Sequence, residues 1–247
     1  MKIVVFKWKE KVNTPLPSRD SKKINNIVYD GNYVNNHYEN IGKVFKGNFQ
    51  YICVTDDPSN ISSEIEIIPL WDYLAEFGGC LRRLYLYSEE AKKIFGPKIF
   101  TCDLDTVFVN DFSHLFRSDA DLIFLRSRNP EKQKSNHIWR LHPGFAVIKP
   151  GVYDSVWKDI QENTLNKLNM SRNYFTGTDQ SWVNYHLNFY KPNLKIEYLD
   201  DSLGFYEARN LRTNILPENA VCVLWSGPRD PYQPEWKQKF RWLKEYI

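Results

Sequence analysis

The sequence lacks an apolar run long enough to cross a bilayer, which takes about 20 residues. Its first apolar segment, residues 1–6, reaches Lys7 before the apolar core of a signal peptide could form. We therefore expect a cytoplasmic protein without stable membrane insertion.

Cysteine is scarce, and no charge sign dominates. The four cysteines are isolated in apolar surroundings without Cys-x-x-Cys spacing, which favours reduced core thiols over disulfides or a zinc site: Cys53, Cys80, Cys102 and Cys222. Lys and Arg number 33 against 30 Asp and Glu, which leaves a net charge of +3. Nucleic-acid binding is therefore permitted but not implied.

The chain has the composition of a folded protein, with 247 residues of which 42% are hydrophobic. Strand-like segments are predicted at 2–8, 50–55, 65–69, 98–102, 121–125, 144–148, 196–199 and 221–225. Helices are predicted at 31–46, 81–94, 152–168, 179–187 and 235–246, and a long loop at 9–28. The alternation predicts an α/β fold with a mixed, mainly parallel central sheet flanked by helices, and we expect one domain over 1–247.

Asp103 and Asp105 come directly after an apolar strand and are the strongest chemical signal in the chain. In an extended segment, residues two apart point the same way, so both carboxylates can reach one point. That arrangement suits a hard divalent cation that also binds substrate phosphates. The alternative for Asp-x-Asp alone is an exposed acidic turn or a helix cap.

One enzyme class with such a pair is the phosphatase of the haloacid-dehalogenase type. There Asp103 would be the nucleophile and Asp105 the general acid. Those proteins carry the motif on their first strand, whereas at least two strands precede it here, and a later Lys with a paired acidic motif is missing. This phosphatase and a non-catalytic nucleotide-sugar binding module remain as alternatives.

The chain resembles retaining glycosyltransferases of family 8, which have the GT-A fold, and related small bacterial and phage enzymes. The resemblance rests on several short motifs and on the order in which they occur. The motifs begin with Val4-Val5-Phe6-Lys7-Trp8, Arg83-Leu84-Tyr85-Leu86-Tyr87, Ile99-Phe100-Thr101-Cys102-Asp103-Leu104-Asp105-Thr106-Val107 and His142-Pro143-Gly144-Phe145-Ala146-Val147. Two further motifs follow, Thr178-Asp179-Gln180-Ser181-Trp182-Val183-Asn184 and Val223-Leu224-Trp225-Ser226-Gly227-Pro228-Arg229. The resemblance implies a single GT-A (Rossmann-like) domain, with a nucleotide-binding part at about 1–110 and an acceptor-side part at about 111–247.

The resemblance also implies roles for individual residues. Asp179 and Gln180 would face the donor sugar as the catalytic pair, acting by positioning and electrostatics. His142 and Gly144 would lie on the acceptor side. Asp103 and Asp105 would hold the metal, and Ser226 occupies the place of the family's third ligand, a His. The donor would be bound by Phe6, Lys7, Trp8, Tyr33, Arg83, Asp103, Leu104, Asp105, Gly227 and Arg229.

The sequence departs from the family pattern at three of these places. Ser226 is a poor replacement for His as a metal ligand, so water or another residue would complete the coordination. The Lys with which family members bind phosphate is missing, and Arg229 lies next to its position. The turn at His142 and Gly144 lacks the usual Asn.

The expected function is a metal-dependent hexosyltransferase, with retention of configuration. Its cofactor would be Mn²⁺ or Mg²⁺, and its donor a nucleotide diphosphate sugar, with UDP-sugars as first choice. The acceptor would be a glycan, a lipid-linked sugar or a hydroxymethylated DNA base, and a phage-encoded enzyme would work in the host cytoplasm. The sequence leaves the donor sugar, the acceptor, the stereochemical outcome and the oligomeric state open.

Overall fold

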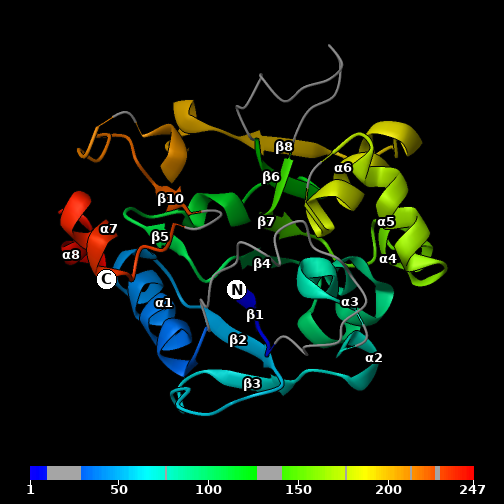
Figure 1. Ribbon diagram of the computed structural model, residues 1–247, viewed down its shortest axis with the longest axis horizontal. Helices are drawn as coiled ribbons and strands as arrows, with labels where there is room; N and C mark the ends of the chain where they lie inside the picture. Colours follow the sequence, from blue (N-terminus) through cyan, green and yellow to red (C-terminus); the bar gives the residue numbers. More distant parts are fainter. Residues whose placement is uncertain (10–28, 76, 127–140, 176, 212, 226–228) are drawn as a thin grey trace.

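A seven-stranded sheet forms the centre of the protein in this computed structural model, which describes residues 1–9, 29–75, 77–126, 141–175, 177–211, 213–225 and 229–247. The strand order is β3-β2-β1-β4-β7-β6-β8 (Figure 1). The strands are β1 (Lys2–Lys7), β2 (Gln50–Thr55), β3 (Glu66–Pro69), β4 (Ile99–Cys102), β6 (Leu122–Arg126), β7 (Leu141–Ile148) and β8 (Ile196–Leu199).

The sheet is mixed and mainly parallel, as predicted. β1 pairs in parallel with β2 and β4, β2 with β3, and β6 with β8. Only β7 runs against its neighbours β4 and β6 among the described strands of this sheet. The predicted α/β architecture is confirmed.

Helices cover both faces of the sheet, and β1 shows why (Figure 1). Its side chains alternate: Ile3 and Val5 pack with α1, while Val4 and Phe6 pack on the other face. Because both faces are covered, the strand is apolar throughout. The first face carries α1 (Gly31–Val44), and the second carries the 3₁₀ helix η1 (Gly79–Tyr87), α3 (Glu89–Phe95), α4 (Ser155–Gln161), α5 (Thr164–Arg172) and α6 (Asp179–Tyr190).

A second sheet of three short strands lies beside the first. It has the order β5-β10-β9, with β5 (Thr106–Phe108), β9 (Phe205–Glu207) and β10 (Cys222–Leu224). Its outer side packs with the C-terminal helices α7 (Pro234–Lys239) and α8 (Leu243–Tyr246) through a cluster that includes Val107, Val223 and Trp225. The remaining elements are short: α2 (Asp72–Ala75), η2 (Ser113–Phe116), η4 (Asp201–Leu203) and η5 (Ala208–Asn210).

Three segments that were each predicted as one continuous helix are divided in two. The segment 81–94 is divided at Ser88, whose extended backbone ends η1 and whose hydroxyl accepts from the Ala91 N–H at 3.0 Å to begin α3. The segment 152–168 is divided at Asn163, which is left-handed at φ 54°. The segment 235–246 is divided at Phe240, whose φ of −109° and ψ of 81° are not helical.

Helix α1 was predicted well because the N-cap residue at its start, Asp30, can be recognised in the sequence. The Asp30 carboxylate accepts from the N–H groups of Asn32 and Tyr33 at 2.9 and 3.2 Å, which caps the helix. The predicted loop at 9–28 lies outside the described residues apart from Lys9. Within the described part of the chain, the helices are all too short or too polar to cross a membrane.

Candidate functional site

The sequence-predicted residues gather at the carboxyl ends of the parallel strands. β1, β2 and β4 run in the same direction and end at Lys7, Thr55 and Cys102. Asp103 and Asp105 follow β4 directly. Ligands of open α/β sheets bind at this edge, so the acidic pair lies where the fold favours a site.

Arg83 connects two carboxylates from distant parts of the chain. Its side chain lies in η1 and is 8% exposed. Its Nη1 atom forms an ion pair with Oδ1 of Asp103, and its Nη2 atom lies 2.8 Å from Oδ2 of Asp179. Burial alone would lower the pKa of Arg83, but the two carboxylates raise it well above its usual value. The guanidinium therefore stays charged and joins the end of β4 to the start of α6.

Asp105 is a buried carboxyl that forms no ion pair within the described part of the chain, although the charge of Arg83 acts on it. It is 7% exposed, and its Oδ2 atom lies 3.5 Å from the hydroxyl of Tyr29. Its Oδ1 atom is buried and has no hydrogen-bond partner among the described residues. Burial, followed by the charges of Asp103 and Asp230, raises the pKa of Asp105 well above its usual value. A bound cation would offset the cost of burying negative charge on Asp105.

Gly144 leaves room for the Asp103 carboxylate. The Asp103 N–H donates to the Gly144 carbonyl at 2.8 Å. A Cβ at Gly144 would lie 2.2 Å from Oδ2 of Asp103 and 2.9 Å from Cε1 of His142. Burial lowers the pKa of His142, while Asp103 and Glu207 act to raise it. The predicted acceptor-side residues thus border the acidic pair.

The start of α6 is fixed to β7 by buried polar contacts. Asn184 accepts from the Leu141 N–H at 2.7 Å and donates to the Leu141 carbonyl at 2.9 Å. The Gln180 side chain donates to the same carbonyl at 3.0 Å, and the Gln180 N–H donates to Asp179 at 2.9 Å. These bonds hold Asp179 and Gln180 in a defined position at the site.

The predicted nucleotide-side residues fall into different environments. Lys7 is 2% exposed and its Nζ atom lies 3.2 Å from Oδ2 of Asp57. Hydrogen bonds from Ser59, Lys9 and Lys7 hold the pKa of Asp57 below its usual range. Phe6 and Leu104 are buried in core clusters, and half-buried Trp8 has the Arg82 guanidinium 5.1 Å from its ring centroid.

Sequence reasoning missed a group of residues around Asp105. The Tyr33 hydroxyl donates to Oδ2 of Asp230 at 2.6 Å, and Asp230 is 1% exposed. The Tyr33 ring lies 5.1 Å from Tyr29 and 4.9 Å from Tyr232, between ring centroids. Only Tyr33 was expected here; Asp230 directly follows the last predicted motif, which ends at Arg229, and was not included in it.

Two of the described residues carry carboxylates that could bind a metal ion. Asp103 and Asp105 offer two carboxylates, and the unpartnered Oδ1 atom of Asp105 fits a divalent cation. No group of three or more His, Cys, Asp or Glu side chains within the described ranges is placed to hold a metal ion. Ser226 and Gly227 lie outside the described residues, and half-buried Arg229 follows them.

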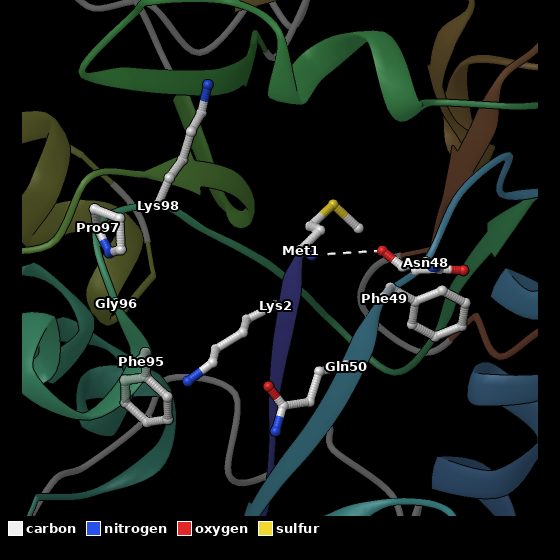
Figure 2. Close-up of a pocket in the computed structure, with 9 residues that line it drawn as sticks. All are labelled: Met1, Lys2, Asn48, Phe49, Gln50, Phe95, Gly96, Pro97 and Lys98. Carbon is white, nitrogen blue, oxygen red and sulfur yellow. Dashed lines mark hydrogen bonds between the residues drawn. The ribbon is translucent and has the colours of Figure 1, made fainter.

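A hollow of about 470 Å³ lies at the opposite, amino-terminal end of the same strands. Figure 2 shows Met1 and Gln50, near the starts of β1 and β2, and Lys98 before β4 around it. The described residues that line it include none of the candidate site residues. Its place in the fold therefore separates it from the acidic site.

The order and direction of the strands, with helices on both faces, define a GT-A fold. The solved structure of the galactosyltransferase LgtC in complex with donor and acceptor sugar analogues is similar, with a TM-score of 0.61 and 12% identity over 100% of this chain and 96% of that one. An active-site mutant of LgtC gives a TM-score of 0.60 and 12% identity over 99% and 95% of the two chains. No protein-family model and no curated protein matches the sequence. The GT-A fold predicted from the motifs is confirmed by this likeness.

Proposed function

We propose that the protein is a metal-dependent glycosyltransferase that transfers a hexose from a nucleotide diphosphate sugar to an acceptor hydroxyl, with retention of configuration. The observation that carries this proposal is the Arg83 bridge between Asp103 and Asp179 beside buried Asp105. It lies at the carboxyl edge of a sheet with the GT-A fold. Support for the substrate class comes from LgtC, which was solved with donor and acceptor sugar analogues.

Asp103 and Asp105 would hold Mn²⁺ or Mg²⁺. When bound, such a cation neutralises the charge that develops on a diphosphate leaving group. Arg83 orients Asp103 through its ion pair and adds a permanent positive charge at the site. Because this charge is paired with both Asp103 and Asp179, its proposed role is to hold the two carboxylates in position for the cation and the donor.

Asp179 and Gln180 would bind the hydroxyls of the donor sugar. Their backbone is fixed by the contacts of α6 with Leu141, so the two side chains need little reorganisation when the donor binds. We assign them positioning and electrostatic roles, because neither is required to form a covalent intermediate in this proposal.

The nucleotide would bind along the ends of β1 and α1. Tyr33 and Trp8 are the proposed stacking rings, while Lys7 fixes the segment after β2 through Asp57. Phe6 and Leu104 support the site from the core. Gly227 and Arg229 are proposed to reach the diphosphate.

His142 and Gly144 would border the acceptor. Support comes from the position of Gly144, where a Cβ would meet both the Asp103 carboxylate and the His142 ring. A glycan, a lipid-linked sugar and a hydroxymethylated DNA base are the acceptor classes to test, and a UDP-sugar is the first donor to test.

A calorimetric screen of nucleotide diphosphate sugars, with and without Mn²⁺, tests the proposal. We expect at least one to bind in Mn²⁺ and to bind at least about tenfold more weakly to Asp105→Asn, because a ligand of the cation has lost its charge. The matched control is Asp119→Asn, since the Asp119 side chain is 80% exposed and pairs with Lys195 away from the site residues. It should bind as the natural protein does.

The alternative functions give different results. A phosphatase would hydrolyse a generic phosphomonoester in Mg²⁺ without any nucleotide sugar, and Asp103→Asn would abolish that turnover. A binding module would retain the nucleotide sugar without hydrolysing or transferring it.

A further inference from the structure

The C-terminal helices carry basic side chains that are not neutralised within the described part of the chain. We call them, with a lysine of α1, the C-terminal basic surface: Lys237 and Lys239 of α7, Arg241 between the helices, Lys244 of α8 and Lys43 of α1. α7 and α8 lie beside α1 (Figure 1), and the Lys43 Nζ atom donates to the Tyr246 carbonyl at 3.1 Å. The ion pairs between described residues involve none of these cations.

Aromatic rings hold two of these cations in place. The Lys237 Nζ atom lies 5.7 Å from the ring centroid of Tyr232, and the Lys239 Nζ atom lies 5.2 Å from that of Trp236. A cation over an aromatic face keeps its charge. Because the rings restrict their movement, both ammonium groups are already positioned for an anionic partner.

Positive charge exceeds negative charge on these three helices. Their acidic side chains are Glu39, Glu235 and Glu245, which are fewer than the cations of the C-terminal basic surface. A surface with such an excess attracts anions and binds them more weakly as salt screens it.

The surface lacks the exposed apolar side chains with which proteins enter a membrane. Phe240, Trp242 and Leu243 are at most 8% exposed and belong to the buried cluster beneath the helices. The exposed large hydrophobic side chains of the described residues all lie outside 229–247. Membrane-surface helices combine basic residues with apolar ones that insert between the lipids. A surface that binds through charge alone suits a polymer of phosphates better than a bilayer.

This surface adjoins the candidate site. The ring of Tyr232, over which Lys237 lies, is 4.9 Å from the ring of Tyr33 between centroids. The Tyr33 ring lies 5.1 Å from that of Tyr29. The Tyr29 hydroxyl lies 3.5 Å from Oδ2 of Asp105. Since this row of rings is continuous, a polyanion bound to the surface would lie beside the acidic pair.

We propose that the C-terminal basic surface binds the phosphate backbone of double-stranded DNA. Lys and Arg neutralise the regularly spaced phosphates of a duplex whatever its base sequence. The inference rests on the proposed function where it selects among the acceptors, because only the hydroxymethylated DNA base is carried on such a backbone. Enzymes that act on a base turn it out of the duplex, so this acceptor needs backbone contacts beside the site.

Binding of the full chain to a short unmodified DNA duplex tests the proposal. Fluorescence anisotropy of a labelled duplex gives the affinity at about 50 and 200 mM salt. The combined substitutions Lys239→Gln, Arg241→Gln and Lys244→Gln remove three exposed charges from the surface. We expect this triple variant to bind at least about tenfold more weakly at the lower salt concentration, and its affinity to depend less on salt, because fewer counterions are released.

A second triple variant is the matched control. Lys92→Gln, Lys93→Gln and Lys191→Gln remove the same charge from exposed positions in α3 and after α6. It should bind the duplex as tightly as the natural protein. Equal losses in the two triple variants would assign binding to net charge and overturn the inference, as would a natural protein that does not bind the duplex at about 50 mM salt.

Vesicles of phosphatidylglycerol, at the same phosphate concentration, test the bilayer as the partner. We expect the natural protein to bind them at least about tenfold more weakly than the duplex, because the surface has no apolar side chains to insert. Equal or tighter binding to the vesicles would overturn the inference. Thermal unfolding shows whether the variants fold. If the first triple variant does not, Arg241→Gln alone decides, and an unchanged affinity and salt dependence in that variant would overturn the inference.

The failure of this inference differs from the failure of the proposed function. If the protein transfers a sugar from a nucleotide diphosphate donor to a glycan and does not bind the duplex, the inference fails and the glycosyltransferase proposal stands. If the duplex binds to the C-terminal basic surface but no nucleotide diphosphate sugar binds to the protein, the DNA-binding surface stands and the proposed function fails.

Discussion

Arg83 and Asp179 form a buried ion pair in which Nη2 lies 2.8 Å from Oδ2. The pair ties η1 to the first turn of α6, and the other arm of the guanidinium holds Asp103. One side chain therefore sets the relative positions of the proposed metal ligands and the proposed sugar-binding residues.

Replacing Arg83 should damage both stability and binding. Arg83→Met leaves Asp179 and Asp103 without their cation, and breaking a buried pair in this way costs about 3 to 5 kcal/mol. Arg83→Lys should recover part of the stability but not donor binding, because an ammonium lacks the two-armed geometry of a guanidinium. Urea unfolding and calorimetry measure the two effects. Equal donor affinity in the natural protein and Arg83→Lys would contradict this account of the bridge.

Gly144→Ala tests the space that Asp103 needs. The new Cβ would lie 2.2 Å from Oδ2 of Asp103, so the carboxylate must move. We expect metal-dependent donor binding to weaken at least about tenfold, since displaced ligand atoms lose the geometry that the site requires. Calorimetry of the donor in Mn²⁺ measures the change.

Gly42→Ala is the matched control for that substitution. Gly42 lies in α1, and a Cβ there would have no atom within 4 Å. Ala should raise the free energy of unfolding by about 0.5 to 1 kcal/mol, because Gly is the poorer helix former. Donor affinity should not change, and a comparable loss in both variants would show that the effect of Gly144→Ala is not local.

Asn184→Ala should loosen α6 from β7. The buried Leu141 N–H would lose its acceptor, which costs about 1 to 3 kcal/mol. Because Gln180 shares the Leu141 carbonyl, we expect kcat to fall more than KM rises. Steady-state kinetics with the identified donor and acceptor would measure this, and a change in KM alone would argue against a positioning role.

His37 should make the protein less stable in acid. Burial lowers the pKa of His37 to about 3, and its Nδ1 atom lies 2.6 Å from the Tyr51 hydroxyl. Below the unfolded pKa of about 6.5, the unfolded chain binds a proton that the folded chain does not, so the free energy of unfolding falls as the pH falls towards 3. This group should account for about 2 kcal/mol of loss between pH 7 and 5. Urea unfolding at both pH values should show a smaller loss in His37→Gln, and parallel losses would contradict the assignment.

The sequence predicted the central sheet well because its strands are continuous apolar segments with clear boundaries. β2 was predicted at its observed bounds, and α1 was predicted from Asp30 and the spacing of its buried residues. β5 and β9 were missed because each has three residues and follows a polar residue or a glycine, Asp105 and Gly204. β10 is equally short but was predicted because it lies within the apolar segment 221–225.

Two of the helix errors have local causes. The Ser88 hydroxyl caps α3 and so ends the preceding helix, and the left-handed backbone of Asn163 divides the segment 152–168. η1 also buries Arg82 and Arg83, which a pattern of apolar spacing places on the surface. In η1, the ion pairs of Arg83 and the hydrogen bond from Arg82 to the Leu74 carbonyl account for this burial of charged residues.

The candidate site was predictable where its residues are adjacent in the chain. Asp103 and Asp105 follow a strand, and Asp179 and Gln180 begin a helix, so local geometry places each pair. Asp230 was not predicted, because its place beside Asp105 depends on how the C-terminal segment returns to α1 through Tyr33. Such long-range convergence has no signature in the spacing of the residues.

Locating a bound donor tests the central claim most directly. Crystals of the chain soaked with Mn²⁺ and the nucleotide diphosphate sugar selected by calorimetry should show an anomalous peak for Mn²⁺ beside Asp103 and Asp105. The diphosphate should contact that ion, and the sugar should face Asp179 and Gln180. A donor bound instead in the hollow between Gln50 and Lys98, with no Mn²⁺ at the acidic pair, would contradict the account.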